Sequence, residues 1–364
     1  MTVTALGRVS RSGHGRYREP DPGVYEAIGP GAADRLGAAL AEWDRAFEDA
    51  RSDEAFTGAL EPALRDFVGR PTPLTEAAAL AGQAGTCRIL LKREDLAHTG
   101  AAVATDVLIQ GMLAQRMGRR RLVASTTSGR AGVAAAAVAA RLGLDCTVHI
   151  GRCDEIAAGP QIAAMTMLGA CVTVVGTGPG DRRQADRSAV SDWLCDVTDS
   201  QLLLVEPQPR FGAPLIAAEG GRLIARETSQ QAAALTGRSP VAVASTAGRG
   251  CGQAFLRAFA DQPATDLYSF GPLAGSAPEQ DGRRCSDRLN RMQAGAVSHT
   301  RAMRAWALLG QCEGLIASID SAFALAGALE AARAYQPDDA LVVLLTGRGE
   351  QDIAQASEYF GLDR

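Results

Sequence analysis

Lysine is almost absent from this sequence of 364 residues. Lys92 is the only one, so that all but one of the 37 basic residues are arginine. A GC-rich coding bias explains such a preference on the surface, where arginine replaces lysine at little cost. Arginine keeps its proton, however, and does not serve as an amine nucleophile. A reaction that needs a lysine amine must therefore use Lys92, or it is excluded.

Long apolar runs are also missing. No run of 18 apolar residues is uninterrupted, and residues 1–23 lack the apolar core of a signal peptide. We therefore expect a cytoplasmic protein that does not contact a membrane. The net charge of −4 offers no basic field for nucleic acid or for an anionic membrane. The expected partners are a small-molecule substrate or ligand, or another protein.

The cysteines show no paired spacing. All eight occur singly, with no C-x-x-C pair and no histidine at zinc-ligand spacing. We expect free thiols in a reducing compartment and no metal site. With 46% hydrophobic residues, the chain is long enough for two domains with sizeable cores. The cysteines are Cys87, Cys146, Cys153, Cys171, Cys195, Cys251, Cys285 and Cys312.

Apolar runs alternate with helical segments along most of the chain. After a polar tail over residues 1–20, expected to be mobile, residues 31–69 show helical spacing. Residues 272–298 are polar and turn-rich, and no element is predicted there. The alternation predicts an α/β fold with two doubly wound units, each a parallel sheet covered on both faces by helices. Strands are predicted at residues 87–92, 120–126, 146–151, 171–176, 240–246, 266–271 and 340–349, and helices at 107–118, 129–143, 161–170, 213–237, 251–261, 300–314 and 320–335.

Six segments in order carry a family resemblance. They read GRPTPL, LLKREDLAHTGA, LAQRMGRRRLVA, GVAAAAVAARLGLDCTVHIG, MLGACVTVV and LVVLLTGRGEQDI. Together they resemble the tryptophan synthase β subunit, a fold-type II pyridoxal phosphate (PLP) enzyme, over most of residues 69–176 and 305–362. The resemblance implies two doubly wound domains with PLP in the cleft between them, a homodimer and an α-subunit partner. On this basis we expect an N-terminal domain of residues 21–70 plus 103–220 and a C-terminal domain of residues 71–102 plus 221–364.

The family's lysine motif is altered at both of its chemical positions. Where the family has H-T-G-A-H-K-x-N, residues 98–105 read HTGAAVAT. The resemblance places Val103 at the lysine that forms an imine with PLP, and Ala102 at the histidine that supports the phosphate. An alkyl side chain forms no imine. Lys92 matches a non-catalytic lysine of the family, so covalent PLP binding is not expected and no cofactor is predicted.

A second family motif, A-E-T-G-A-G-Q-H-G, binds the carboxylate of the amino-acid substrate and supplies a glutamate as general acid and base. Residues 124–132 read ASTTSGRAG here, with serine at the glutamate position. A serine hydroxyl is too weak an acid to transfer protons near neutral pH. Hydroxyls, helix N-terminal N–H groups and an added arginine still suit an anion, although a turn that only caps the helix is the alternative. The predicted ligand-binding residues are Ser125, Thr126, Ser128 and Arg130.

The family's phosphate cup, G-G-G-S-N-A, becomes TAGRGC at residues 246–251. The side chains of Thr246 and Ala247 narrow the cup, and Arg249 reaches into or over it. A carboxylate or a different phosphate is therefore expected there in place of PLP, with simple turn geometry as the alternative. The predicted ligand-binding residues are Thr246, Gly248 and Arg249.

Four further positions complete the predicted site. The family's G-x-x-G-P-H-P becomes VEPQPR at residues 205–210, and its acidic gating motif has no counterpart at residues 295–300. By the resemblance, Asp320 lies where the family has a glutamate beside the cofactor ring, and Thr346 matches the hydroxyl that faces the pyridine nitrogen. Thr346 is predicted to bind the ligand. The predicted catalytic residues are Glu206, Asp320 and His299.

Three functions compete. A working tryptophan synthase β chain would need the amine and the carboxylate that are both missing. A repurposed, PLP-independent enzyme of the lyase or cyclase type would act on an aromatic, indole or amino-acid-derived anion by orientation and acid–base catalysis. Cyclisation, isomerisation or carbon–carbon bond formation in secondary metabolism would suit it. A non-catalytic pseudoenzyme would stabilise or regulate a partner biosynthetic enzyme. The arginines gained in two loops favour the repurposed enzyme.

Overall fold

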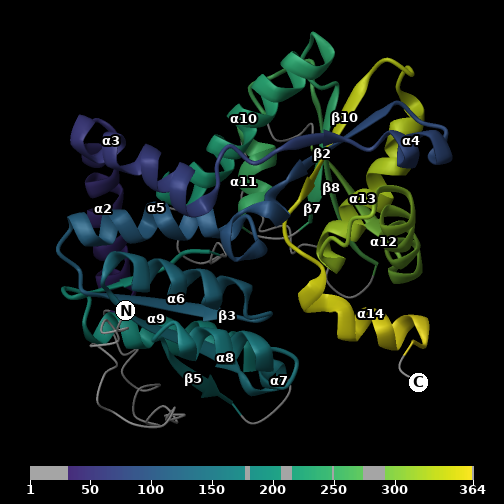
Figure 1. Ribbon diagram of the computed structural model, residues 1–364. Coiled ribbons are helices and arrows are strands. Elements are labelled where there is room, and N and C mark those ends of the chain that lie inside the picture. Colours follow the sequence, from purple (N-terminus) through teal and green to yellow (C-terminus); the bar gives the residue numbers. More distant parts are fainter. Residues whose placement is uncertain (1–31, 177–180, 206–214, 248–249, 274–291, 363–364) are drawn as a thin grey trace, which may run out of the picture. The chain divides into compact units, whose positions relative to one another are not determined.

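Two separate sheets organise the chain. The computed structural model describes residues 32–176, 181–205, 215–247, 250–273 and 292–362 (Figure 1). Its contacts divide the chain into unit 1, residues 1–57 and 107–205, and unit 2, residues 58–106 and 206–364. The predicted domains have boundaries after residues 70, 102 and 220. These differ from the positions at which the chain passes between the two units, after residues 57, 106 and 205. Helix α5 (Val103–Arg116) begins in unit 2 and continues into unit 1.

Unit 1 is built on a sheet of parallel strands in the order β5-β4-β3-β6. The strands are β3 (Arg121–Thr126), β4 (Asp145–Gly151), β5 (Cys171–Val175) and β6 (Ser200–Leu202). Neighbouring residues of β3 point to opposite faces of the sheet, as in any strand. Ser125 donates a hydrogen bond to Asp186 of α9 (Asp181–Cys195), while Thr126 approaches Gly132 of α6 (Arg130–Leu142). Helices α6 and α9 therefore cover opposite faces. The other helices of this unit are α2 (Ala32–Arg51), α7 (Arg152–Glu155) and α8 (Gly159–Met167), and α3 (Glu54–Ala63) begins in it.

Unit 2 contains a six-stranded sheet in the order β1-β2-β10-β7-β8-β9, with only β1 antiparallel to its neighbour. Its strands are β1 (Leu74–Glu76), β2 (Arg88–Arg93), β7 (Ala242–Thr246), β8 (Asp266–Pro272), β9 (Met292–Val297) and β10 (Ala340–Leu345). Its helices are α4 (Ala78–Ala84), α10 (Glu219–Thr236), α11 (Cys251–Ala258), α12 (His299–Glu313), α13 (Ile319–Ala331) and α14 (Ile353–Phe360). Short helices occur at η1 (Leu64–Val68), η2 (Glu94–Leu96), η3 (His98–Gly100), η4 (Leu215–Ala218), η6 (Ala332–Ala334) and η7 (Glu350–Asp352).

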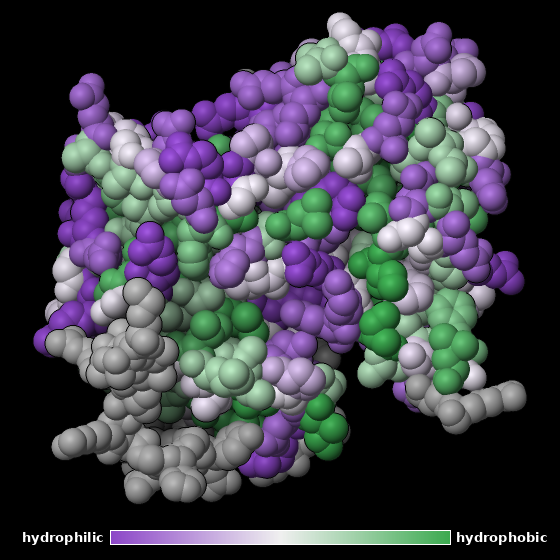
Figure 2. Space-filling model, in the orientation of Figure 1, coloured by the Kyte–Doolittle hydropathy of each residue, from purple (hydrophilic) through white to green (hydrophobic). Residues whose placement is uncertain are grey.

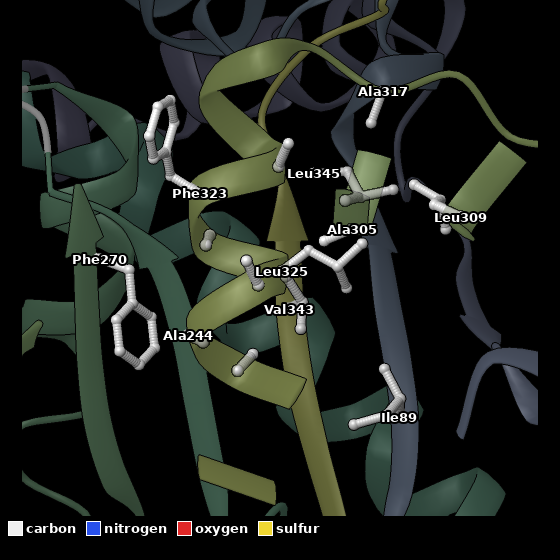
Figure 3. Packing of buried hydrophobic residues seen from close by; sticks show 14 of the residues in the cluster. Ile89, Ala244, Phe270, Ala305, Leu309, Ala317, Phe323, Leu325, Val343 and Leu345 are labelled. Carbon is white, nitrogen blue, oxygen red and sulfur yellow. The ribbon is translucent and has the colours of Figure 1, made fainter. Parts of the chain in front are cut away.

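Strand β10 is buried on both faces, as expected for the centre of a parallel sheet. Leu341, Val343 and Leu345 join the core beneath α4, α12 and α13 (Figure 3). Val342 and Leu344 join a second core beneath α10 and α11. Burying each of these side chains stabilises the fold by roughly 1.5–3 kcal/mol.

The predicted fold class is confirmed: both sheets are parallel in their interiors and carry helices on two faces. The strands and helices predicted from apolar runs are present. The prediction was wrong for residues 292–297, which form β9 at the sheet edge, and it missed α4, α7, α9, α14 and the short strands β1 and β6. Hydrophilic side chains predominate on the face in Figure 2, with smaller hydrophobic areas among them. None of the helices in the described ranges is long and apolar enough to span a membrane.

Close packing at Gly132 gives a test of the unit 1 core. A Cβ there would lie 2.3 Å from the Met165 sulfur and 2.9 Å from Val148 Cγ1. We expect Gly132→Ala to lower the free energy of unfolding by about 1–3 kcal/mol, because the core must shift to accept the methyl group. Gly82→Ala is the control, since a Cβ at Gly82 meets nothing within 4 Å. It should raise stability slightly, as measured by urea denaturation.

Candidate functional site

The segment that leads into Val103 is fixed by the end of β10. The Ala102 N–H donates to Thr346 O over 2.9 Å, and the Arg348 N–H donates to Gly100 O over 2.8 Å. Val103 is half-buried and is the first residue of α5. The structure therefore brings the predicted position 103 and Thr346 together within unit 2.

Thr99 has a left-handed backbone, with φ of 64°. That conformation is uncommon for a residue with a branched Cβ and costs of order 1–3 kcal/mol. Its buried Oγ1 has no hydrogen-bond partner among the described residues. Gly100 follows with φ of 76°, and a Cβ there would lie 2.8 Å from the Arg348 side chain. The strained turn before α5 is therefore held by its surroundings.

Hydroxyl groups line the other side of Thr346. Its Oγ1 lies 3.2 Å from Ser321 Oγ, and Ser321 Oγ accepts a 3.0 Å bond from the Thr346 N–H. Ser318 Oγ lies 2.8 Å from Ser321 Oγ and caps α13. Asp320 is exposed in the first turn of the same helix. Ser318 and Ser321 are buried, whereas Thr346 is half-buried and Asp320 is exposed.

The single lysine lies in a buried ionic cluster. Lys92 Nζ donates to Thr72 O at 2.8 Å, Glu227 Oε2 at 2.9 Å and Gln231 Oε1 at 3.0 Å, and its side chain is 0% exposed. An ammonium group has three donors, and all three are used. Lys92 confirms the expectation of a structural lysine.

Arg70 completes this cluster. Its guanidinium bonds to both carboxylate oxygens of Glu94 and both of Glu227, at 2.7–3.0 Å, and Nη1 also donates to Thr105 Oγ1 at 2.8 Å. Burial opposes its charge, but the two glutamates raise the pKa of Arg70 above its usual value. Burial lowers the pKa of Lys92, and Glu227 opposes that effect. Lys92 and Arg70 thus share Glu227 as an acceptor, and we call these two cations with Glu94 and Glu227 the Arg70–Lys92 cluster.

The start of α6 forms a separate site in unit 1. Gly129 is its N-cap with φ of 81°, and no side chain caps the helix in the described structure. First-turn N–H groups of a helix suit an anion. Gln161 packs on Gly129, within 2.4 Å of the position a Cβ would take, and its buried Oε1 has no partner in the described ranges. Asn and Gln amides are assigned by their contacts, so this group presents either a donor or an acceptor.

The predicted residues around α6 do not all point the same way. Ser125 Oγ donates to Asp186 Oδ1 over 2.6 Å, toward α9. Thr126 is buried against α6, Ser128 is exposed and Arg130 is half-buried. Ser128 and Arg130 are therefore the side chains best placed beside the helix start.

Other predicted positions are described only in part. Thr246 ends β7 and is half-buried; the following Ala247 N–H donates to Phe270 O. Glu206, Gly248 and Arg249 lie outside the described residues. His299 begins α12, where its ring meets Tyr359 at 5.1 Å and Phe323 at 6.2 Å. Its catalytic role stays a prediction.

These two sheets, with helices on both faces and candidate groups at the carboxyl ends of their strands, define the fold-type II architecture of PLP enzymes. The family model of pyridoxal-phosphate dependent enzymes matches residues 66–347. The chain belongs to this family.

Comparison with known proteins agrees with that assignment. The chain is 34% identical to the tryptophan synthase beta chain of Streptomyces coelicolor, covering 90% of this chain and 87% of that one. It is 31% identical to that of Mycobacterium leprae, covering 90% and 89%. A crystal structure of a mutant O-ureido-L-serine synthase with O-ureido-L-serine bound has a similar fold, with a TM-score of 0.65 and 17% identity over 82% of this chain and 94% of that one.

Sequence reasoning missed Gln161, Asp186 and Asp106. Gln161 contacts Gly129, which lies 32 residues earlier, and Asp186 accepts a hydrogen bond from Ser125, which lies 61 residues earlier. Both lie on helices whose buried faces could not be assigned from the sequence. Asp106 is one turn beyond Val103 and is fully buried. An acidic residue in the first turn of a helix ordinarily indicates exposure to solvent, so no sequence pattern indicated its burial.

The Arg70–Lys92 cluster predicts that removing the charge of one glutamate strongly lowers the free energy of unfolding. Glu227→Gln keeps the shape but removes one of the two glutamate charges that Arg70 and Lys92 share. We expect the free energy of unfolding to fall by about 3 kcal/mol, because a buried cation loses its partner. Asp66→Asn, in the exposed pair with Arg65, is the control and should leave the denaturation midpoint unchanged. Equal effects of the two variants would contradict this account of the cluster.

Proposed function

We propose that this chain is a PLP-independent enzyme on a tryptophan synthase β-like scaffold. Its substrate is an aromatic or amino-acid-derived anion. The observation that carries the proposal is the state of Lys92, whose amine is buried and has all three donors engaged. An imine needs a free amine with a lone pair. Since Val103 stands at the position that the resemblance gives to the reactive lysine, the chain does not fit covalent PLP.

The start of α6 supports a carboxylate ligand. First-turn N–H groups, the exposed hydroxyl of Ser128 and the guanidinium of Arg130 form a set that suits a planar anion. Gln161 adds a polar group at the same helix end. These groups bind and orient an anion without a cofactor.

Within unit 2, the hydroxyl of Thr346 supports hydrogen-bonding contacts to a polar ligand. Orientation of two reacting groups alone lowers a barrier substantially, and cyclisation or isomerisation needs no electron-withdrawing cofactor. We propose Asp320, Glu206 and His299 as the acid and base groups, and Thr246, Gly248 and Arg249 as further ligand contacts. A homodimer is part of the same proposal.

The first test asks whether PLP bonds to the protein. We expect wild-type protein incubated with PLP and then reduced with borohydride to carry no added mass on the Lys92 peptide, because its amine is not accessible. Val103→Lys supplies an exposed amine at the start of α5 and should gain the added mass at residue 103. Mass spectrometry of the peptides reads both results. A reduced adduct on Lys92 of the wild-type protein would end the proposal.

A second test concerns the carboxylate. By calorimetry, indole-3-acetate should bind more tightly than indole, which has no carboxylate. Arg130→Met should weaken indole-3-acetate binding by about tenfold, the loss of one charge-assisted hydrogen bond, and leave indole unchanged. Arg141→Met, at the opposite end of α6, is the matched control. Equal affinities of the two ligands would contradict the assignment of α6.

The alternative function, a pseudoenzyme that stabilises a partner biosynthetic enzyme, makes a different prediction. Such a subunit would co-purify with its partner and would bind neither ligand. Native mass spectrometry of the purified protein distinguishes a bound small molecule from a bound protein.

A further inference from the structure

Asp106 is an acid placed where water does not reach. It lies in the first turn of α5, three residues after Val103, and is only 3% exposed. Residues three apart lie on the same side of a helix, and side chains lean toward its N-terminus. The Asp106 carboxyl is therefore directed toward the turn that begins at Val103.

The surroundings of Asp106 come from several elements of unit 2. The backbone N–H of Gly220, in the first turn of α10, favours the ionised form of its carboxyl. A Cβ at Gly220 would lie 1.9 Å from Asp106 Oδ1, so only glycine leaves room for this acid. Oδ1 itself has no hydrogen-bond partner within the described residues.

The cations near Asp106 are already balanced by other carboxylates. Arg70 and Lys92 supply two positive charges, and Glu94 and Glu227 supply two negative charges. Glu219, at the start of α10, adds another negative charge near the carboxyl, and the Cys251 thiol of α11 faces it without a charge, since burial raises the pKa of that thiol. An ionised Asp106 would therefore be an uncompensated buried anion, which is costly.

Burial raises the pKa of Asp106 to about 7; Glu94 and Glu219 act in the same direction, while Arg70 and the Gly220 N–H oppose them. The unfolded chain gives this group its ordinary pKa of 3.8. The folded unit thus holds a proton that the unfolded chain releases. Between these two values, stability falls as the pH rises, and above about pH 7 the loss is complete.

We propose that Asp106 is a proton switch of unit 2: its carboxyl is neutral in the folded unit, and loss of the proton destabilises the contact between the starts of α5 and α10. Because α5 begins at Val103, the switch acts on the element that carries the candidate site. The inference does not depend on the proposed function, since it rests on the burial, the charges and the Gly220 contact alone.

Asp106→Asn tests the switch because it keeps the shape and removes the ionisable proton. We expect the unfolding equilibrium constant of the wild-type chain, divided by that of the variant, to rise about tenfold from pH 5 to pH 6 and to become constant above pH 8. Asp338→Asn, an exposed aspartate of the same unit, is the control and should give a ratio independent of pH. A flat ratio for Asp106→Asn would overturn the proposal.

A direct titration of the wild-type Asp106 carboxyl tests the proposal even if Asp106→Asn does not fold. In wild-type protein with ¹³C-labelled aspartate, the Asp106 carboxyl carbon, connected to its backbone amide for assignment, should titrate with a midpoint near pH 7. A signal that is already ionised at pH 5 would overturn the proposal regardless of the variant.

Discussion

The pairing of Arg70 and Lys92 with Glu94 and Glu227 is the constraint on which the rest of unit 2 depends. Glu227 of α10 binds both cations, and Glu94 binds Arg70 directly after β2. The cluster thus ties α10 and the end of β2 to the segment before β1. Buried ion pairs contribute little net stability, but they penalise any arrangement that leaves one charge alone. Their consequence here is that the amine of the only lysine is committed to structure.

The same cluster determines whether the neighbouring side chains of α5 carry a charge. Thr105 and Asp106, the third and fourth residues of α5, approach it as neutral partners: Thr105 accepts from Arg70, and Asp106 lies where no positive charge is left to balance it. A strained Thr99 and a close-packed Gly100 hold the preceding turn in place. The start of α5 is therefore held in place by the turn before it and by the cluster beside it.

Much of the fold could be predicted from the sequence, because apolar runs such as those of β2, β4 and β10 are buried on both faces and stand out from their surroundings. Helix α9 was missed because it packs a polar face on β3 and β4, through Asp186 and Asp192, so its apolar period is weak. Strand β9 was missed because an edge strand is mostly exposed and needs no apolar run. At the candidate site, local motifs predicted roles for Val103, Ser128 and Arg130, which stay predictions. They did not identify Asp106 or Gln161, whose burial depends on α10 and on Gly129, contacts that no local pattern encodes.

The central claim is that the amine of Lys92 is not available for chemistry in the folded protein. Reductive methylation with formaldehyde and cyanoborohydride, followed by peptide mass spectrometry, measures this directly, with the α-amino group as the internal reference. The account predicts that the α-amino group is methylated while Lys92 stays unmodified until the chain is denatured. Methylation of Lys92 in the folded protein at the rate of the α-amino group would contradict it.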